Sequence, residues 1–318
     1  MKPFLVKPAI KDYLWGGTRL RDEFGKVSDL DILAESWELS CHPDGEDFIA
    51  SGELEGMSFA EFAEKNPDAL GKNCTKFGGF PILIKLIDAK DNLSVQVHPD
   101  NEYARKYEND NGKTEMWYIV DCEDGAELIY GFKEEITEEQ FRKAIADNTL
   151  LEYVNRVPVK KGDVFFITPG TLHAIGKGIL IAEIQQSSNV TYRVYDYGRV
   201  GNDGKPRELH IEKAVEVTKL APSPEQKKAE TVNVSDGITA QKLASCEYFD
   251  VQKFEIDGEL ALCTTAESFK HVLVIDGEGE VFCGESVLSV NKGSGIFVPA
   301  GTDNCSIKGK CTIIMTMI

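Results

Sequence analysis

Short segments in which apolar and polar residues alternate recur along the middle of the chain. They are rich in β-branched and aromatic residues and cover residues 80–86, 93–97, 115–121, 127–132, 164–168 and 179–184. Alternation of this kind places apolar side chains on one face of a β-strand and polar side chains on the other. Turn-forming residues separate the segments, as at Gly78-Gly79, Asp124-Gly125 and Lys161-Gly162-Asp163. The pattern predicts a mainly β protein of the sandwich or jelly-roll type.

Three segments instead have the period of a helix. Thr137 and Gln140 form a capping box ahead of an apolar helix face. A second helix is predicted to begin at Ser58, and a third lies within residues 210–220. The first helix is part of a helical insertion around residues 133–156.

A β motif occurs twice in the chain. Residues 161–173 align without gaps on residues 292–304, and both copies place glycines at the same positions. A second matching segment lies upstream of the motif in each copy. More residues separate this segment from the motif in the first copy than in the second, and the difference is about the length of the helical insertion. The motif predicts two related jelly rolls, and chance similarity between short hairpins is the alternative. The first copy ends in His173 and the second in Asn304, so only the first could be a metal site.

A polar, proline-containing segment at residues 221–228 favours neither helix nor strand, and we expect the domain boundary there. The first domain would span residues 1–220 and the second residues 221–318.

Charge and composition narrow the classes of partner. The 318 residues include 35 Lys and Arg against 53 Asp and Glu, a net charge of −18. A surface of this sign repels nucleic acid and anionic membranes, so neither is an expected partner, and no obligate protein partner is evident. The sequence has no apolar run of the roughly 18 residues that span a membrane and no signal-peptide pattern, which predicts a cytoplasmic protein.

The eight cysteines include no Cys-x-x-Cys pair, so neither a zinc finger nor a disulfide scaffold is indicated. Cys122, Cys263 and Cys283 lie in strand-like apolar segments, and we expect them to be buried as small apolar side chains.

Four residues in the first copy are candidate metal ligands. Gln96 and His98 are two apart on a predicted strand, so their side chains leave the same face. Glu115 begins another strand, and His173 follows the Pro169-Gly170 turn. Two imidazoles, a carboxylate and an amide oxygen suit Zn, Fe, Mn or Co, and are too poor in sulfur for a structural zinc site.

The turn before His173 resembles a motif of the cupins, small jelly rolls that bind a metal. More narrowly, several motifs together resemble the type I mannose-6-phosphate isomerases in their short bacterial form. These motifs are Ala34-Glu35-Ser36-Trp37-Glu38, Lys85-Leu86-Ile87-Asp88-Ala89, residues 93–100, Lys113-Thr114-Glu115-Met116, Pro169-Gly170-Thr171-Leu172-His173-Ala174 and Thr191-Tyr192-Arg193-Val194-Tyr195-Asp196. The fold implied is a double jelly roll, or bicupin, with a small helical insertion.

The resemblance implies a zinc-dependent isomerase that interconverts mannose 6-phosphate and fructose 6-phosphate through an enediol. One zinc ion per chain would be held by Gln96, His98, Glu115 and His173. Arg193 would be the active-site arginine, and Lys85 and Lys113 would bind substrate or its phosphate. Residues 1–220 would be the catalytic cupin domain, and residues 221–318 a cupin-like domain without metal ligands.

Two positions depart from the family. Gly112 stands where longer members have a histidine, and Asn189 stands where an aspartate is common. The residues leave the proton-transferring base open among Glu183, a metal-bound hydroxide and His98.

Two other functions also fit: a metal-dependent cupin oxygenase using Fe(II), and a sugar-binding bicupin without turnover.

Overall fold

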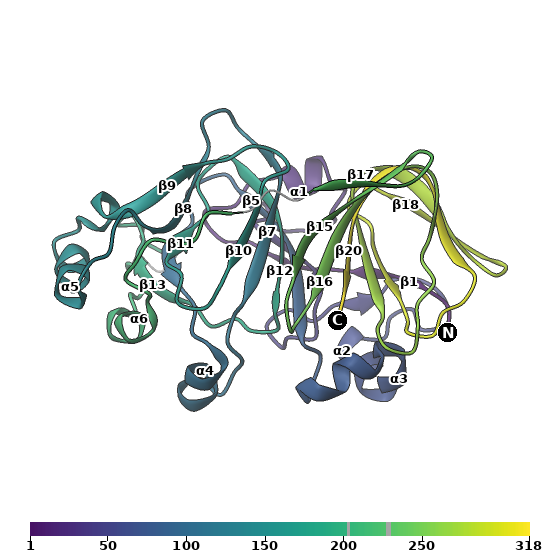
Figure 1. Cartoon of the computed structure of the whole chain (residues 1–318). Coiled ribbons are helices and arrows are strands. Elements are labelled where there is room, and N and C mark those ends of the chain that lie inside the picture. Colours follow the sequence, from purple (N-terminus) through teal and green to yellow (C-terminus); the bar gives the residue numbers. More distant parts are fainter. Residues whose placement is uncertain (202–203, 227–229) are drawn as a thin grey trace. The chain divides into compact units, whose positions relative to one another are not determined.

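The computed structural model describes residues 1–201, 204–226 and 230–318 and shows a mainly β protein (Figure 1). The chain divides into two compact units, and each is built from segments that are distant in the sequence. Unit 1 contains Met1–Lys11, Thr18–Leu86 and Lys228–Ile318, whereas unit 2 contains Asp12–Gly17 and Ile87–Lys227. The division into domains at residues 1–220 and 221–318 stays a prediction.

Unit 1 is built on a large antiparallel sheet. Its strands lie in the order β14 (Thr231–Ser235), β15 (Ile238–Ser245), β16 (Asp250–Ala261), β20 (Cys305–Met317), β17 (Lys270–Cys283), β19 (Gly295–Val298), β1 (Phe4–Lys7) and β4 (Phe48–Ile49), and β18 (Ser286–Asn291) pairs with β17. The unit also contains β2 (Ala9–Lys11), β3 (Glu35–Leu39) and most of β5 (Ile82–Ala89). Its helical segments are α1 (Arg19–Asp22), α2 (Phe59–Lys65), α3 (Pro67–Leu70) and η1 (Lys72–Phe77).

Aromatic rings join helix α2 to the sheet of unit 1. Phe297 on β19 is fully buried, and its ring centroid lies 5.0–5.7 Å from four other phenylalanine rings: Phe4, Phe59, Phe62 and Phe269. Stacked and edge-to-face pairs at these distances add to the free energy gained by burial. The cluster therefore ties α2, β1, β19 and the residue before β17 into one core.

Unit 2 contains two groups of antiparallel strands. The first is the ladder β10 (Val164–Ile167), β7 (Glu115–Cys122) and β12 (Ile179–Gln186). The second is a five-stranded sheet in the order β13 (Tyr192–Tyr195), β6 (Val95–Val97), β11 (His173–Ala174), β8 (Glu127–Phe132) and β9 (Val154–Pro158). The helical segments of unit 2 are α4 (Asn101–Tyr107), α5 (Glu138–Ala146), η2 (Leu150–Glu152) and α6 (Ile211–Val217).

Helices α5 and α6 cover one face of the five-stranded sheet (Figure 1). Val95 and Val97 on β6 pack in the same core cluster as Phe141 of α5 and Ala214 of α6. Side chains alternate along a strand, so the residue between these two valines points away from the helices. The residues directly opposite it on the two neighbouring strands point the same way. That second face carries Gln96, Arg193 and His173.

The predicted helices and strands are confirmed. Thr137 and Gln140 cap α5 reciprocally, with the Thr137 Oγ1 accepting from the Gln140 N–H at 3.1 Å and the Gln140 Oε1 accepting from the Thr137 N–H at 2.7 Å. Ser58 caps α2, and α6 lies within residues 210–220. Each predicted strand overlaps an observed one. Of the predicted linker, residues 221–226 form no helix or strand, and residues 227 and 228 lie outside the described residues.

The two copies of the sequence motif have the same backbone conformation. Gly162 and Gly293 have φ values of 92° and 94°, and Gly170 and Gly301 have φ values of 84° and 72°. The strands between these glycines are β10 and β19. Positive φ is open to glycine at little steric cost, which explains why both copies need it there. The predicted β repeat is therefore confirmed.

The expectation that three cysteines are buried is wrong for Cys263, which is exposed, while Cys122 and Cys283 are only half-buried. Cys263 follows the end of β16 and Cys283 ends β17, so both lie where the strands leave the core. In the described part of the chain, no helix is both long and apolar enough to cross a membrane.

Replacing Phe297 with alanine should lower the free energy of unfolding by about 3–5 kcal/mol, because it leaves a cavity among four rings. Urea denaturation would measure the change. Val287→Ala on the exposed side of β18 is the control and should change stability by less than about 0.5 kcal/mol. Equal effects of the two substitutions would contradict the central role of the aromatic cluster.

Candidate active site

Three of the predicted site residues lie side by side across the five-stranded sheet. Arg193 on β13 is opposite Gln96 on β6, and Gln96 is opposite His173 on β11. Residues directly opposite one another on neighbouring strands project from the same face. The register therefore places a guanidinium, an amide and an imidazole in one row on the face that the helices leave uncovered.

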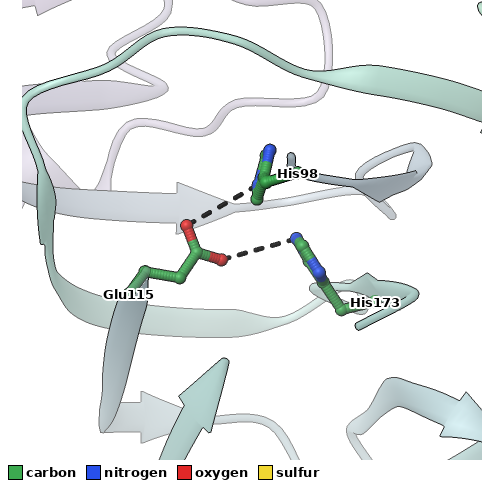
Figure 2. A group of neighbouring side chains, drawn as sticks. All are labelled: His98, Glu115 and His173. Atoms are coloured by element: carbon green, nitrogen blue, oxygen red, sulfur yellow. Dashed lines mark ion pairs between the residues drawn. The ribbon is translucent and has the colours of Figure 1, made fainter. Parts of the chain in front are cut away.

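Glu115 brings a carboxylate from the β10-β7-β12 ladder to this row. Its Oε1 lies 3.4 Å from the Nε2 of His173, and its Oε2 lies 3.6 Å from the Nε2 of His98 (Figure 2). One ligand atom from each of the three residues fits within 4.8 Å of the others. All three side chains are buried. The site thus lies between the two groups of strands in unit 2.

The backbone fixes how the two imidazoles are oriented. The Nδ1 of His98 lies 2.8 Å from the carbonyl oxygen of Val190, and the Nδ1 of His173 lies 2.9 Å from the carbonyl oxygen of Thr171. A carbonyl can only accept a hydrogen bond, so each Nδ1 must carry the hydrogen. In a neutral ring, the Nε2 atom then has a lone pair, and both Nε2 atoms face the carboxylate of Glu115.

This arrangement fits a metal ion. Burial lowers the pKa of His173 to about 4, so its ring is neutral near neutral pH. Imidazole lone pairs that face carboxylate oxygens at 3.4–3.6 Å are unfavourable unless a cation lies between them. Ligating histidines in proteins commonly donate their other ring N–H to a carbonyl, as His98 and His173 do. Two imidazoles and one carboxylate form a donor set that suits zinc or a similar divalent ion.

Gln96 reaches the same centre. Its Nε2 lies 3.5 Å from the Nε2 of His173, and its Oε1 accepts from the Ser94 hydroxyl at 3.3 Å. A half-turn of the amide exchanges the positions of its oxygen and nitrogen, which are assigned from their surroundings. The structure therefore brings all four predicted ligands together.

Lys113 lies directly against the triad. Its Nζ is 3.0 Å from the Oε2 of Glu115 and 3.3 Å from the Nε2 of His98. The side chain is buried, and the Oε1 of Glu183 lies 3.9 Å from the same ammonium. Glu183 in turn accepts a hydrogen bond from the Trp117 indole at 2.7 Å. Both Glu183 and Trp117 are buried.

Arg193 is held at the edge of the site by two contacts. Its Nε donates to the Ser94 hydroxyl at 3.3 Å, and a terminal nitrogen donates to the Glu208 carbonyl at 2.9 Å. Burial and the nearby Arg207 lower the pKa of Arg193. An arginine remains charged at neutral pH despite such a shift, because its ordinary pKa is above about 12.

Two further arginines lie near Arg193 and share a single aspartate. Arg199 and Arg207 both donate to the carboxylate of Asp196. No sequence motif marks Arg207 as a site residue. Its proximity depends on the loop that returns to the end of β13, and no motif marks that loop.

Lys85 belongs to unit 1, where it is buried on β5. Its Nζ lies 3.3 Å from the Oε2 of Glu35 and 4.9 Å from the centre of the Trp37 ring. The indole N–H of Trp37 donates to the same carboxylate oxygen at 2.7 Å. These contacts join two of the sequence motifs that resemble the isomerase family, and both motifs lie in unit 1. A substrate contact for Lys85 stays a prediction.

Comparison with known proteins identifies the family. The family description "Phosphomannose isomerase type I, catalytic domain" matches residues 4–130, and "Mannose-6-phosphate isomerase, cupin domain" matches residues 239–318. A mannose-6-phosphate isomerase from Bacillus subtilis is 38% identical over 99% of this chain and 98% of its own length. One from Streptococcus mutans is 36% identical over 98% of this chain and 97% of its own length. The chain belongs to the type I mannose-6-phosphate isomerases.

A solved structure supports the same assignment. The crystal structure of the Bacillus subtilis mannose-6-phosphate isomerase is 36% identical, covers both chains completely and superposes with a TM-score of 0.93. A putative mannosephosphate isomerase from Archaeoglobus fulgidus, 23% identical with a TM-score of 0.78, shares the fold over 99% of this chain and 98% of its own. The predicted jelly-roll fold and the predicted class of aldose-ketose isomerase are confirmed. The roles of the individual site residues stay predictions.

Replacing His173 with alanine should remove bound metal and activity together, because it removes one of two imidazoles from the triad. Most of the fold should remain, since the residue lies on a two-residue strand. Metal analysis beside kinetics and circular dichroism would measure these effects. His42→Ala, a histidine of unit 1 outside the triad, is the control and should retain metal. Full metal content and turnover in His173→Ala would rule out its role as a ligand.

Proposed function

We propose that this protein interconverts mannose 6-phosphate and fructose 6-phosphate with one zinc ion per chain, held by Gln96, His98, Glu115 and His173. The observation that carries the proposal is the buried triad, in which the Nε2 atoms of two imidazoles and a carboxylate converge on one point. When bound, zinc would supply positive charge for the oxygens of the reacting sugar.

The reaction moves a proton between C1 and C2 of the sugar through an enediol. Negative charge develops on the oxygens of this intermediate, and fixed positive charge stabilises it. Arg193 provides such a charge on the same sheet face as Gln96 and His173. Its two hydrogen bonds hold the guanidinium in place before substrate binds, so little reorganisation is needed during the reaction.

Lys113 adds a second cation at the triad. Its ammonium contacts both Glu115 and His98, so it would lie within reach of a sugar oxygen bound at the same centre. Glu183 and Trp117 have a positioning role in this proposal, because Trp117 holds the carboxylate that faces Lys113. The base that transfers the proton is not assigned by these contacts.

The substrate phosphate needs local positive charge on a protein with a net charge of −18. Arg193, Arg199 and Arg207 lie around Asp196, so this part of unit 2 carries more positive than negative charge. We assign attraction of the phosphate to these arginines, together with Lys113 of the same unit. Arginine suits this role, because its planar guanidinium matches the geometry of phosphate oxygens.

The test is a coupled assay for fructose 6-phosphate formation from mannose 6-phosphate. Treatment with a chelator should abolish turnover, and added zinc should restore it, because the triad loses and regains its cation. Iron(II) added in place of zinc, under air and under nitrogen, tests for oxygen chemistry. Turnover that is unaffected by complete removal of metal would overturn the metal-dependent proposal. A bound metal without any isomerisation would overturn the assigned reaction.

Arg193→Ala should keep its metal and lose mainly turnover, because Arg193 is beside the triad without belonging to it. A loss of about 10²-fold or more in kcat corresponds to the removal of one fixed charge from a developing oxyanion. Arg193→Lys, which retains charge but not the forked geometry, should recover part of the activity. The assignment fails if Arg193→Ala loses metal, or if its kcat is unchanged.

A further inference from the structure

Three cysteines gather at one end of the large sheet in unit 1, and neither the activity nor the metal triad uses them. Cys283 is the last residue of β17, Cys305 is the first residue of β20, and Cys263 follows the end of β16. Their exposure differs: Cys263 is exposed, Cys283 is half-buried, and Cys305 is only 2% exposed. The three strands are neighbours in the order β16-β20-β17.

The register places Cys283 directly opposite Cys305. On the other side of β20, the carbonyl of Cys305 accepts from the Leu262 N–H at 2.8 Å, and the Cys305 N–H donates to the Cys263 sulfur at 3.4 Å. The N–H and C=O of one residue in an antiparallel strand point to the same side. Because both groups of Cys305 point toward β16, Cys305 and Cys283 form a non-hydrogen-bonded pair.

This type of pair has the spacing that a disulfide requires. The Cα atoms of non-hydrogen-bonded partners are about 4.5 Å apart, and their side chains are closer than in hydrogen-bonded pairs. Disulfides span Cα separations of about 4.4–6.8 Å. Both side chains also project from the core face of the sheet, since Cys305 belongs to the buried cluster and Cys283 packs against it. The Cys283 thiol is close enough to affect the ionisation of Cys305 through a side-chain hydrogen bond.

We propose that Cys283 and Cys305 are a peroxide-sensitive thiol pair that closes reversibly into a cross-strand disulfide. The Cys283 thiolate attacks the peroxide, the O–O bond breaks, and Cys283 becomes a sulfenic acid while hydroxide leaves. The Cys305 sulfur then attacks the Cys283 sulfur, and water leaves as the S–S bond forms. In total, two thiols lose two hydrogens and two electrons, and one hydrogen peroxide becomes two waters.

The order of the two steps follows from access. Cys283 is half-buried and can meet peroxide, whereas Cys305 is buried and its pKa is raised by burial to about 12. A thiol with so high a pKa reacts poorly with peroxide by itself, because the thiolate is the nucleophile. Cys305 is therefore not the first thiol to be oxidised, and its position directly opposite Cys283 makes it the resolving thiol, which gives up its proton as it attacks the sulfenic acid.

Cys263 and Cys311 provide contrasts within the same unit. Cys263 contacts the backbone of Cys305 from the β16 side. The residue paired with Cys305 on β17 is Cys283. Cys311 is also buried on β20, but Gly277 on β17 and Ile256 on β16 lie opposite it, so it has no thiol across either ladder. Among the cysteines in the described part of the chain, only Cys283 combines the register, the face and the exposure that the reaction needs.

The test uses the full-length protein, first reduced and then treated with a small excess of hydrogen peroxide. Remaining thiols are blocked with N-ethylmaleimide after unfolding, and the digested protein is mapped by mass spectrometry. We expect a linked peptide pair that contains Cys283 and Cys305, a mass lower by about 2 Da than that of the two thiol peptides, and a return to thiols with dithiothreitol. Cys311 should stay reduced.

Two serine variants complete the experiment. Cys263→Ser should form the same linked pair as the unchanged protein, and Cys283→Ser should leave Cys305 as a free thiol. The proposal is overturned if Cys305 links to Cys263, or if Cys283 passes to sulfinic acid without any linked peptide. The result for the unchanged protein decides the matter even if a variant folds poorly.

Discussion

Alternation of side chains along the five-stranded sheet of unit 2 is the constraint on which the site depends. Valines on β6 face helices α5 and α6, so Gln96 between them must face the opposite side. The same alternation sends His173 and Arg193 to that side from the flanking strands. A slip of one residue in any of these pairings would turn a polar ligand toward the core and a valine toward the site. The register that buries the valines is therefore also the register that places the site residues.

The second determinant is the direction in which the imidazoles present their lone pairs. Carbonyl oxygens of Val190 and Thr171 fix the hydrogen on the Nδ1 atoms, which leaves the Nε2 atoms facing Glu115. The Lys113 ammonium supplies positive charge on the side of His98, and the His173 Nε2 faces the other oxygen of Glu115. The buried electrostatics of the site therefore favour a metal as strongly as the identity of the ligands does.

The two copies of the glycine motif show how one backbone can serve two purposes. Both copies share a strand bounded by glycines with positive φ, but only the first ends in a histidine. In unit 1 the second copy instead contributes Phe297 to a cluster of five aromatic rings. The position after the turn in that copy is Asn304, followed by Cys305, whose buried thiol lies opposite Cys283.

Much of this protein is determined by its sequence. The alternation of apolar residues predicts the strands, the capping box predicts α5, and the spacing of Gln96 and His98 places both on one strand face, because each of these signals is local. The motifs around Glu115 and His173 indicate the rest of the metal site only through the resemblance to the family. Other features depend on segments that meet only after folding. Arg207 beside Asp196, the carbonyls that orient the two histidines, and the pairing of Cys283 with Cys305 leave no local pattern. These contacts form between segments that are separated by long loops. They depend on the register in which the strands pair, and that register is set by the packing of the complete sheets.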